Sequence, residues 1–183
     1  MSDCRRQALI DAPIEIVWAL VRDVNRHPEW WPRVVEVECE GLEEGCTYRQ
    51  VTQSPFGYQE LDVVVDRLDE LRELRIRCTN TGTFVDLALT PAGTGTFVEA
   101  RFGMDPATTR LRVFDAVAGK RYFRRWLEQS LDAMQRVAHR QARSLHLRDA
   151  TNDAPRTSVV QAEGASMWGQ QSRRLAADRS NRC

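Results

Sequence analysis

The chain has 183 residues, which is long enough for one domain with a sizeable hydrophobic core. Its 26 acidic and 26 basic residues balance, so the total charge gives no reason to expect a nucleic-acid partner or an anionic membrane. No apolar run reaches the roughly 20 residues of a membrane span and no signal peptide is evident, so we expect a cytoplasmic protein without an integral membrane segment.

The first predicted elements are a strand and two helices. Residues 5–12 have the pattern of a short strand, and Pro13 suits the first position of a helix that runs to about Val24. An apolar stripe along that helix indicates one buried face. The segment 27–32, HPEWWP, is predicted to be a short second helix or a tight turn, because its two prolines do not fit the interior of a longer helix.

Six segments with the signature of β-strands follow. Each is short, rich in β-branched or aromatic residues and bounded by turn residues, and the short connections indicate an antiparallel meander. Apolar and charged residues alternate along several of them, which predicts one buried and one solvated face of the sheet. The predicted strands are residues 34–42, 46–53, 58–66, 73–80, 83–90 and 96–104.

From about Thr109 to Leu147 the apolar period becomes that of a long helix. The apolar stripe of this helix can cover one face of a seven-stranded sheet, so residues 1–147 are predicted to form one domain. Residues 148–183 are polar and lack a sustained period, which is typical of a disordered tail. Trp168 is the one large aromatic residue in that tail, and the sequence does not indicate its role.

Residue usage indicates the cellular setting. Every basic residue except Lys120 is an arginine, a bias that we attribute to a GC-rich bacterial genome. The five cysteines are an odd number without a C-x-x-C pair, which indicates reduced thiols. Cys39 and Cys46 flank a predicted hairpin tip where they could face each other, although two separate half-buried thiols are the expectation.

Three segments resemble a known family: IDAPIEIVWALVRDVNRHPEWWPRVVEVE at residues 10–38, LTPAGTGTFVEARF at 89–102 and RYFRRWLEQSLDAMQRVA at 121–138. They are similar to the START-like (SRPBCC) superfamily, in its polyketide cyclase/dehydrase and lipid-transport branch, over about residues 5–145. The resemblance implies an α+β helix-grip fold. In that fold a curved, seven-stranded antiparallel sheet wraps around a long C-terminal helix, and two short helices follow the first strand. The matching residues make the fold, so they indicate architecture more than activity.

The resemblance also implies a cavity between the sheet and the long helix, closed at one end by the two short helices. Of the two tryptophans in HPEWWP, at least one is expected to seal the core. The other either packs there as well or lines the cavity entrance. Aromatic residues on the last strands and the first half of the long helix also suit a cavity wall. The predicted ligand-binding residues are Trp30, Trp31, Tyr48, Phe102, Tyr122 and Trp126.

The sequence contains no dinucleotide-binding, Walker, zinc-protease or serine-hydrolase motif, and we expect no cofactor and no metal site. His139 and His146 are expected at the surface, and His27 is expected to be a capping or turn residue. The strand alternation places Tyr48 and Gln50 inside, which makes them the candidates for catalysis. They form no acid–base pair, and each also fits an ordinary core or edge position.

Three functions remain open at this stage. The favoured one is the binding of a small hydrophobic ligand such as a lipid, a quinone or a polyketide-like molecule. The alternative is a polyketide aromatase/cyclase or dehydratase, which must transfer protons and stabilise an enolate inside the cavity. A protein–protein adaptor with the same fold is the third. The sequence identifies neither the ligand nor the oligomeric state.

Overall fold

The structure is a computed structural model that describes residues 2–54, 57–105, 112–113 and 119–152. Its elements are β1 (Ser2–Ile10), α1 (Ile14–Arg22), the 3-10 helix η1 (Val24–Arg26), α2 (His27–Trp30), β2 (Val34–Glu38), β3 (Thr47–Ser54), β4 (Gly57–Asp69), β5 (Glu73–Cys78), β6 (Thr83–Ala92), β7 (Gly95–Met104) and α4 (Lys120–Asn152). A strand, short helices, six further strands and a long helix follow one another as the sequence predicted.

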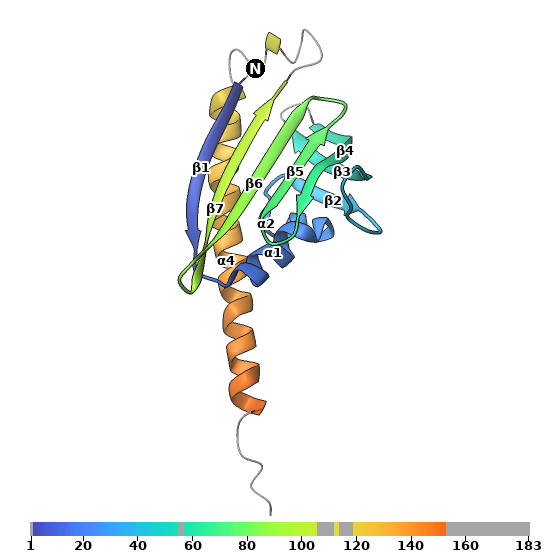
Figure 1. Ribbon diagram of the computed structural model, residues 1–183. Helices are drawn as coiled ribbons and strands as arrows, with labels where there is room; N and C mark the ends of the chain where they lie inside the picture. The colour runs from blue at the N-terminus through green and yellow to red at the C-terminus, as the bar shows by residue number, and fades with distance from the viewer. Residues whose placement is uncertain (1, 55–56, 106–111, 114–118, 153–183) are drawn as a thin grey trace, which may run out of the picture. The chain divides into compact units, whose positions relative to one another are not determined.

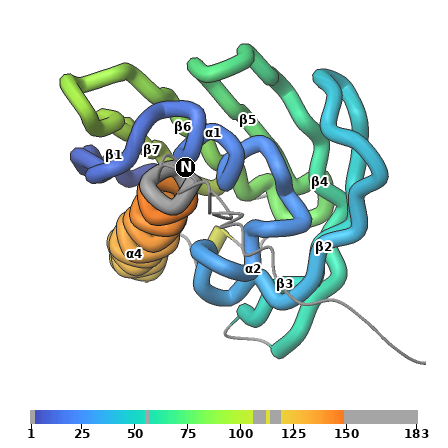
Figure 2. Tube along the Cα trace, turned by 90° about the horizontal axis from the view of Figure 1, so that it is seen from below, coloured from blue at the N-terminus to red at the C-terminus, as the bar shows by residue number. Residues whose placement is uncertain are grey.

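The seven strands form one antiparallel sheet in the order β1-β7-β6-β5-β4-β3-β2. From β2 to β7, neighbours in the sheet are also neighbours in the sequence, as expected of a meander. The exception is β1, which pairs with β7 along its whole length, beginning with Ser2 opposite Met104. The sheet is curved, and α4 lies on its inner side along β1 and β7 (Figures 1 and 2). This arrangement is the helix-grip fold that the sequence predicted.

The alternation of side chains along the strands is also confirmed. On β5, Leu74, Ile76 and Cys78 are buried, while Arg75 and Arg77 between them lie on the outer face. These two arginines form ion pairs at 2.9 Å with aspartates of β6 and β4. The inner face is covered by a stripe of buried residues at helical spacing on α4: Phe123, Leu127, Ser130, Leu131, Met134, Val137 and Ala138.

Side chains from the segment after α1 cap the C-terminal end of that helix. The last carbonyl groups of a helix have no donor within it, so they need one from elsewhere. His27 Nε2 lies 3.1 Å from the Val21 oxygen, and Trp30 Nε1 donates to the Leu20 oxygen at 3.0 Å. His27 is thus a capping residue, as predicted, and it is completely buried. The two contacts fix α2 against α1.

The connection between β2 and β3 holds the two cysteines that were considered as a facing pair. Cys39 and Cys46 are half-buried and not bridged. Each directs its Sγ toward the Gly41 oxygen, at 3.3 Å and 3.8 Å respectively. They are therefore two separate thiols, as expected, which share one acceptor.

The helix α4 extends farther than the sequence indicated. It reaches Asn152, five residues beyond the predicted domain boundary at Leu147. Residues 143–148 are exposed, and an exposed helix end carries no apolar period, which is why the sequence did not indicate these last turns of the helix. Residues 153–183 with Trp168, and most of the predicted first turns of the helix, lie outside the described residues. Within the described part of the chain, no helix has both the length and the apolarity that a membrane crossing requires.

Candidate functional site

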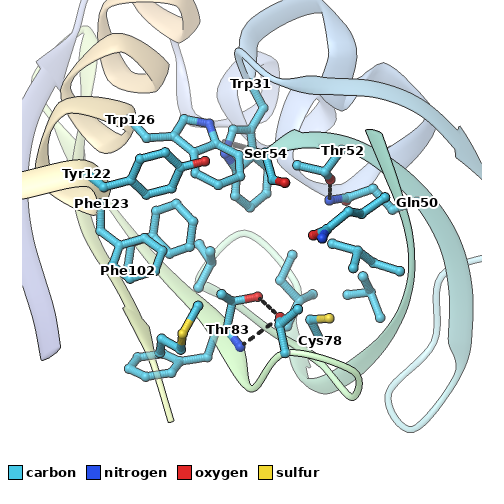
Figure 3. A pocket seen from close by; sticks show the side chains of 18 residues that line it. Trp31, Gln50, Thr52, Ser54, Cys78, Thr83, Phe102, Tyr122, Phe123 and Trp126 are labelled. Carbon is cyan, nitrogen blue, oxygen red and sulfur yellow. Dashed lines mark hydrogen bonds between the residues drawn. The ribbon is translucent and has the colours of Figure 1, made fainter. Parts of the chain in front are cut away.

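A cavity of about 80 Å³ lies between the inner face of the sheet and the first turns of α4. Strands β3 to β7 form one side of it, while Tyr122, Phe123 and Trp126 of α4 and Trp31 from the turn after α2 form the other (Figure 3). This is the position that the sequence predicted, between the sheet and the N-terminal half of the long helix. The cavity is therefore the candidate functional site.

Aromatic side chains in contact with one another form one wall of the cavity. The ring of Phe102 is central, because its centroid lies 4.8 Å from those of Phe123 and Trp126. The ring of Trp126 in turn lies 6.2 Å from Trp31 and 5.8 Å from Tyr122. Tilted and edge-to-face pairs of this kind contribute about 0.5–1.5 kcal/mol each beyond the area they bury. The result is a continuous apolar wall of rings from β7, α4 and the turn after α2.

The other walls carry a few polar groups. Gln50 Nε2 donates to Thr52 Oγ1 at 2.9 Å, across the cavity from the aromatic wall (Figure 3). Where the chain passes from β5 to β6, the hydroxyl oxygens of Thr81 and Thr83 lie 2.9 Å apart. Because these groups bond to one another, they add little polarity to the cavity beyond the amide of Gln50.

Two buried polar atoms on the cavity-lining side chains have no hydrogen-bond partner in the described part of the chain. They are Gln50 Oε1 and Trp126 Nε1. If the amide of Gln50 were turned over, Thr52 would donate to its oxygen and its nitrogen would be the unpaired atom. An unpaired buried polar atom costs about 1–3 kcal/mol. A bound molecule that supplies the missing partners would recover part of that energy.

The cavity wall contains four of the six predicted ligand-binding residues: Trp31, Phe102, Tyr122 and Trp126. It does not contain Trp30 or Tyr48. Trp30 closes the core instead, where its indole caps α1. Tyr48 faces the same side of β3 as Gln50 but lies two residues away, near the thiols of Cys39 and Cys46. Its hydroxyl is buried without a partner among the described residues, and burial raises its pKa, so it stays protonated.

Sequence reasoning missed Arg33, which lies beside the cavity. Its Nη1 donates to the Tyr122 hydroxyl at 3.3 Å, and its Cζ lies 4.7 Å from the centroid of that ring. The same guanidinium is 5.9 Å from the Trp126 ring. Burial raises the pKa of Tyr122, and the charge of Arg33 opposes that rise. No specific signal in the sequence pointed to Arg33, because a proline followed by arginine fits several turn types.

The wall offers hydrogen bonds and apolar contact but no acid–base pair. Among the described residues that line the cavity, none is charged and none is a histidine. His139 lies at the surface, 3.3 Å from Asp11, and His146 is exposed, as predicted. The described residues contain no group of three or more His, Cys, Asp and Glu side chains that could hold a metal ion. Phe114 is one of the aromatic residues in the first half of the predicted long helix, and it lies outside the described residues.

A family comparison matches most of the chain. The model of the family described as "Polyketide cyclase / dehydrase and lipid transport" matches residues 1–139. That range includes all of the cavity wall and ends within α4. No curated protein matches the chain.

Solved structures share the fold at low sequence identity. A START superfamily protein from Mycobacterium smegmatis aligns with a TM-score of 0.64 and 13% identity, over 76% of this chain and 98% of that one. A protein from Nitrosomonas europaea gives 0.60 and 13%, over 76% and 95% of the two chains. One from Chromobacterium violaceum gives 0.60 and 17%, over 75% and 98%. At such identities the likeness shows the fold alone, which agrees with the START-like resemblance of the sequence.

Proposed function

Because the chain belongs to the polyketide cyclase/dehydrase and lipid transport family, we propose that it binds a small hydrophobic ligand in the cavity between the sheet and α4. The ligand belongs to the class of lipids, quinones and polyketide-like molecules. The residues proposed to contact it are Trp31, Phe102, Tyr122 and Trp126, with Gln50 as a polar contact. The proposal includes the bacterial cytoplasm as the setting, which rests on the sequence alone.

One observation carries this proposal: an aromatic, uncharged cavity whose wall holds an unpaired acceptor and an unpaired donor, Gln50 Oε1 and Trp126 Nε1. Small-molecule sites are usually apolar pockets in which a few polar groups fix the orientation of the ligand. A core built for stability alone gains nothing from two unpaired polar atoms, since each one destabilises the fold.

The size of the cavity limits how the ligand is held. A volume of about 80 Å³ is well below the roughly 300–1,000 Å³ of pockets that enclose drug-sized molecules. The polar lining residues Ser54, Gln59, Thr81 and Tyr122 are partly exposed, and we infer that they form the rim of the cavity. We therefore infer that the apolar end of the ligand enters between the rings while its polar end stays at the rim.

The alternative function is a polyketide cyclase or dehydratase. The observation in its favour is the pair formed by Arg33 and the Tyr122 hydroxyl, since two donors beside an apolar cavity could stabilise an enolate oxygen. Such an enzyme also needs a base to remove a proton, and no carboxylate or imidazole lies on the described wall. Binding is therefore preferred to catalysis.

The test is titration with a neutral, environment-sensitive dye, N-phenyl-1-naphthylamine, followed by dye emission and by quenching of tryptophan fluorescence. We expect binding with a dissociation constant below about 100 μM, or roughly −5.5 kcal/mol. Tyr122→Ala should weaken binding at least fivefold, and because Tyr122 is partly exposed it should cost less stability than the loss of a fully buried aromatic residue. Arg136→Ala, on an exposed position of the same helix, is the matched control and should bind as the parent protein does.

Failure to bind the dye, a fatty acid, a quinone and an aromatic polyketide below 100 μM would contradict the proposal and favour the adaptor function. Turnover of a poly-β-keto substrate, lost in Gln50→Ala while binding is retained, would favour the enzyme. The two outcomes are distinguished by product analysis of the same mixtures.

A further inference from the structure

The backbone at Arg33 has a conformation that an arginine rarely adopts. The Val34 N–H donates to the Trp31 oxygen at 3.1 Å, so residues 31–34 form a hydrogen-bonded turn with Pro32 in its second position. Arg33 has φ of 82°, which is the value for the third position of a type II turn and normally requires glycine. A side chain that stays in a left-handed position against this preference suggests that its chemistry is needed there.

The guanidinium of Arg33 has N–H donors left for a further partner. It is a planar group with five N–H donors, and the Tyr122 hydroxyl accepts from Nη1. The ion pairs of the described residues include Arg75 with Asp86 and Arg77 with Asp66, but none includes Arg33. Its charge is held next to two aromatic rings, where an arginine binds carboxylates well because it is weakly hydrated and rigid.

Arg33 lies beside the residues at the rim of the cavity without being part of the cavity wall. The Arg33 oxygen accepts a hydrogen bond from the Gln53 N–H at 2.7 Å, which places its backbone beside the end of β3. The next residue of that strand, Ser54, is on the rim, and so is Tyr122 on α4. Arg33 therefore reaches from the end of β3 to α4 past the partly exposed side of the cavity.

We propose that Arg33 is a specificity residue that binds a carboxylate at the polar end of the ligand, so that the preferred ligand is an amphipathic anion rather than a neutral molecule. This inference rests on the proposed function, because it assumes that the apolar end occupies the cavity. The planar fork of the guanidinium matches the two oxygens of a carboxylate. The Tyr122 hydroxyl holds the guanidinium from one side. The turn at Arg33 fixes the backbone from which the side chain extends.

The experiment compares two ligands of nearly the same shape, 2-naphthoate and its neutral amide, 2-naphthamide, by calorimetry and tryptophan quenching. The parent protein should bind 2-naphthoate at least tenfold more tightly than the amide. Arg33→Gly, which suits the backbone of the turn, should lose about tenfold or more in affinity for 2-naphthoate and less than threefold for the amide. Arg33→Gln keeps the bulk of the side chain and should show the same selective loss.

Arg136→Gln is the control, since it removes the same charge from an exposed position on α4 far along the chain from the turn. It should leave both affinities unchanged. An equal loss for both ligands in Arg33→Gln would overturn the carboxylate assignment and leave the proposed function standing. A preference for 2-naphthoate that persists in both Arg33→Gly and Arg33→Gln would also overturn the carboxylate assignment. If the parent protein binds neither ligand nor the neutral dye, the inference and the proposed function both fail.

Discussion

Trp30 and Trp31 are adjacent in the sequence and stack with ring centroids 5.4 Å apart, yet they serve different parts of the molecule. Trp30 is 2% exposed and its indole N–H bonds to the Leu20 oxygen at the end of α1. Trp31 packs against Phe102 and Trp126 and belongs to the cavity wall. One dipeptide therefore connects the sealed end of the core to the candidate binding site.

Substitution of each tryptophan by phenylalanine should separate these two parts. Trp30→Phe leaves the buried Leu20 oxygen without its donor and removes core volume, so we expect a loss of about 2–4 kcal/mol in the free energy of unfolding. Trp31→Phe should cost less than about 2 kcal/mol but change dye affinity more than threefold. Urea unfolding and dye titration measure both quantities. The assignment is wrong if Trp30→Phe is the variant with altered binding and unaltered stability.

The stripe on α4 predicts a contrast between two positions on that helix. Leu131 is 6% exposed and packs in the core, so Leu131→Ala should cost about 2–5 kcal/mol, as large-to-small core substitutions do. Arg136 is exposed, so Arg136→Ala should cost less than about 0.5 kcal/mol. Chemical unfolding of both variants checks the orientation of the helix. Similar costs for the two would mean that a different face of α4 contacts the sheet.

Stability should fall between pH 7 and pH 5 because of His27. Burial lowers the pKa of His27 to about 4, against about 6.5 in the unfolded chain. The unfolded state therefore binds a proton that the folded state does not, and stability that is present above pH 6.5 is lost as the pH approaches 4. The loss attributable to His27 should be about 2 kcal/mol at pH 5.

His27→Gln is the matched variant for this measurement. The glutamine amide can still donate to the Val21 oxygen but does not titrate. The free energy of unfolding of the parent protein minus that of His27→Gln, both measured with urea, should fall by about 2 kcal/mol from pH 7 to pH 5. A constant difference across this range would show that His27 is not responsible, since all other titrating groups are common to both proteins.

Tyr48→Phe should leave the protein folded and able to bind. The Tyr48 hydroxyl is buried and has no partner in the described part of the chain, so its removal should leave stability unchanged or raise it by up to about 1 kcal/mol. Because Tyr48 is not on the cavity wall, dye affinity should stay within twofold. A strong loss of binding, or of turnover of a poly-β-keto substrate, would mean that Tyr48 contributes to the functional site.

Truncation after Leu147 tests the predicted domain boundary. The helical residues 143–148 are exposed, and the segment that follows is polar in sequence. The melting midpoint of the truncated chain should therefore stay within a few degrees of the full-length value. A large drop in the midpoint would mean that residues 148–183 contribute to the folded domain.

The faces of the sheet could be predicted from the sequence, but positions along a strand could not. Alternation tells which side of β3 a residue occupies, and it placed Tyr48 and Gln50 correctly on the inner side. Two residues along a strand correspond to about 7 Å, which decides whether a side chain reaches the cavity. That distance depends on where the sheet curves and where α4 begins to cover it. The sequence therefore predicted the same role for Tyr48 and Gln50, whereas in the structure only Gln50 lies on the cavity wall.

Arg33 and the tryptophan pair show a second limit of prediction from the sequence. Composition gives no reason to prefer Trp31 to Trp30 for the cavity, because their difference comes from the backbone turn between α2 and β2. The same turn directs Arg33 toward Tyr122, which is 89 residues away in the chain. A proline followed by arginine fits several turn types, and only the observed φ identifies this one. Contacts made across such a separation are set by the assembled fold and not by local sequence.

The pairing of β1 with β7 has a consequence for how the chain folds. Every other neighbouring pair in the sheet closes a short connection, whereas joining Ile10 to Thr96 closes one of about 85 residues. By loop-closure entropy this step costs about 3 kcal/mol more than a tight hairpin. During synthesis, β1 must therefore remain without its partner until β7 has been made. Docking of β1 is the step expected to limit the refolding rate, as non-local pairing does in other sheets.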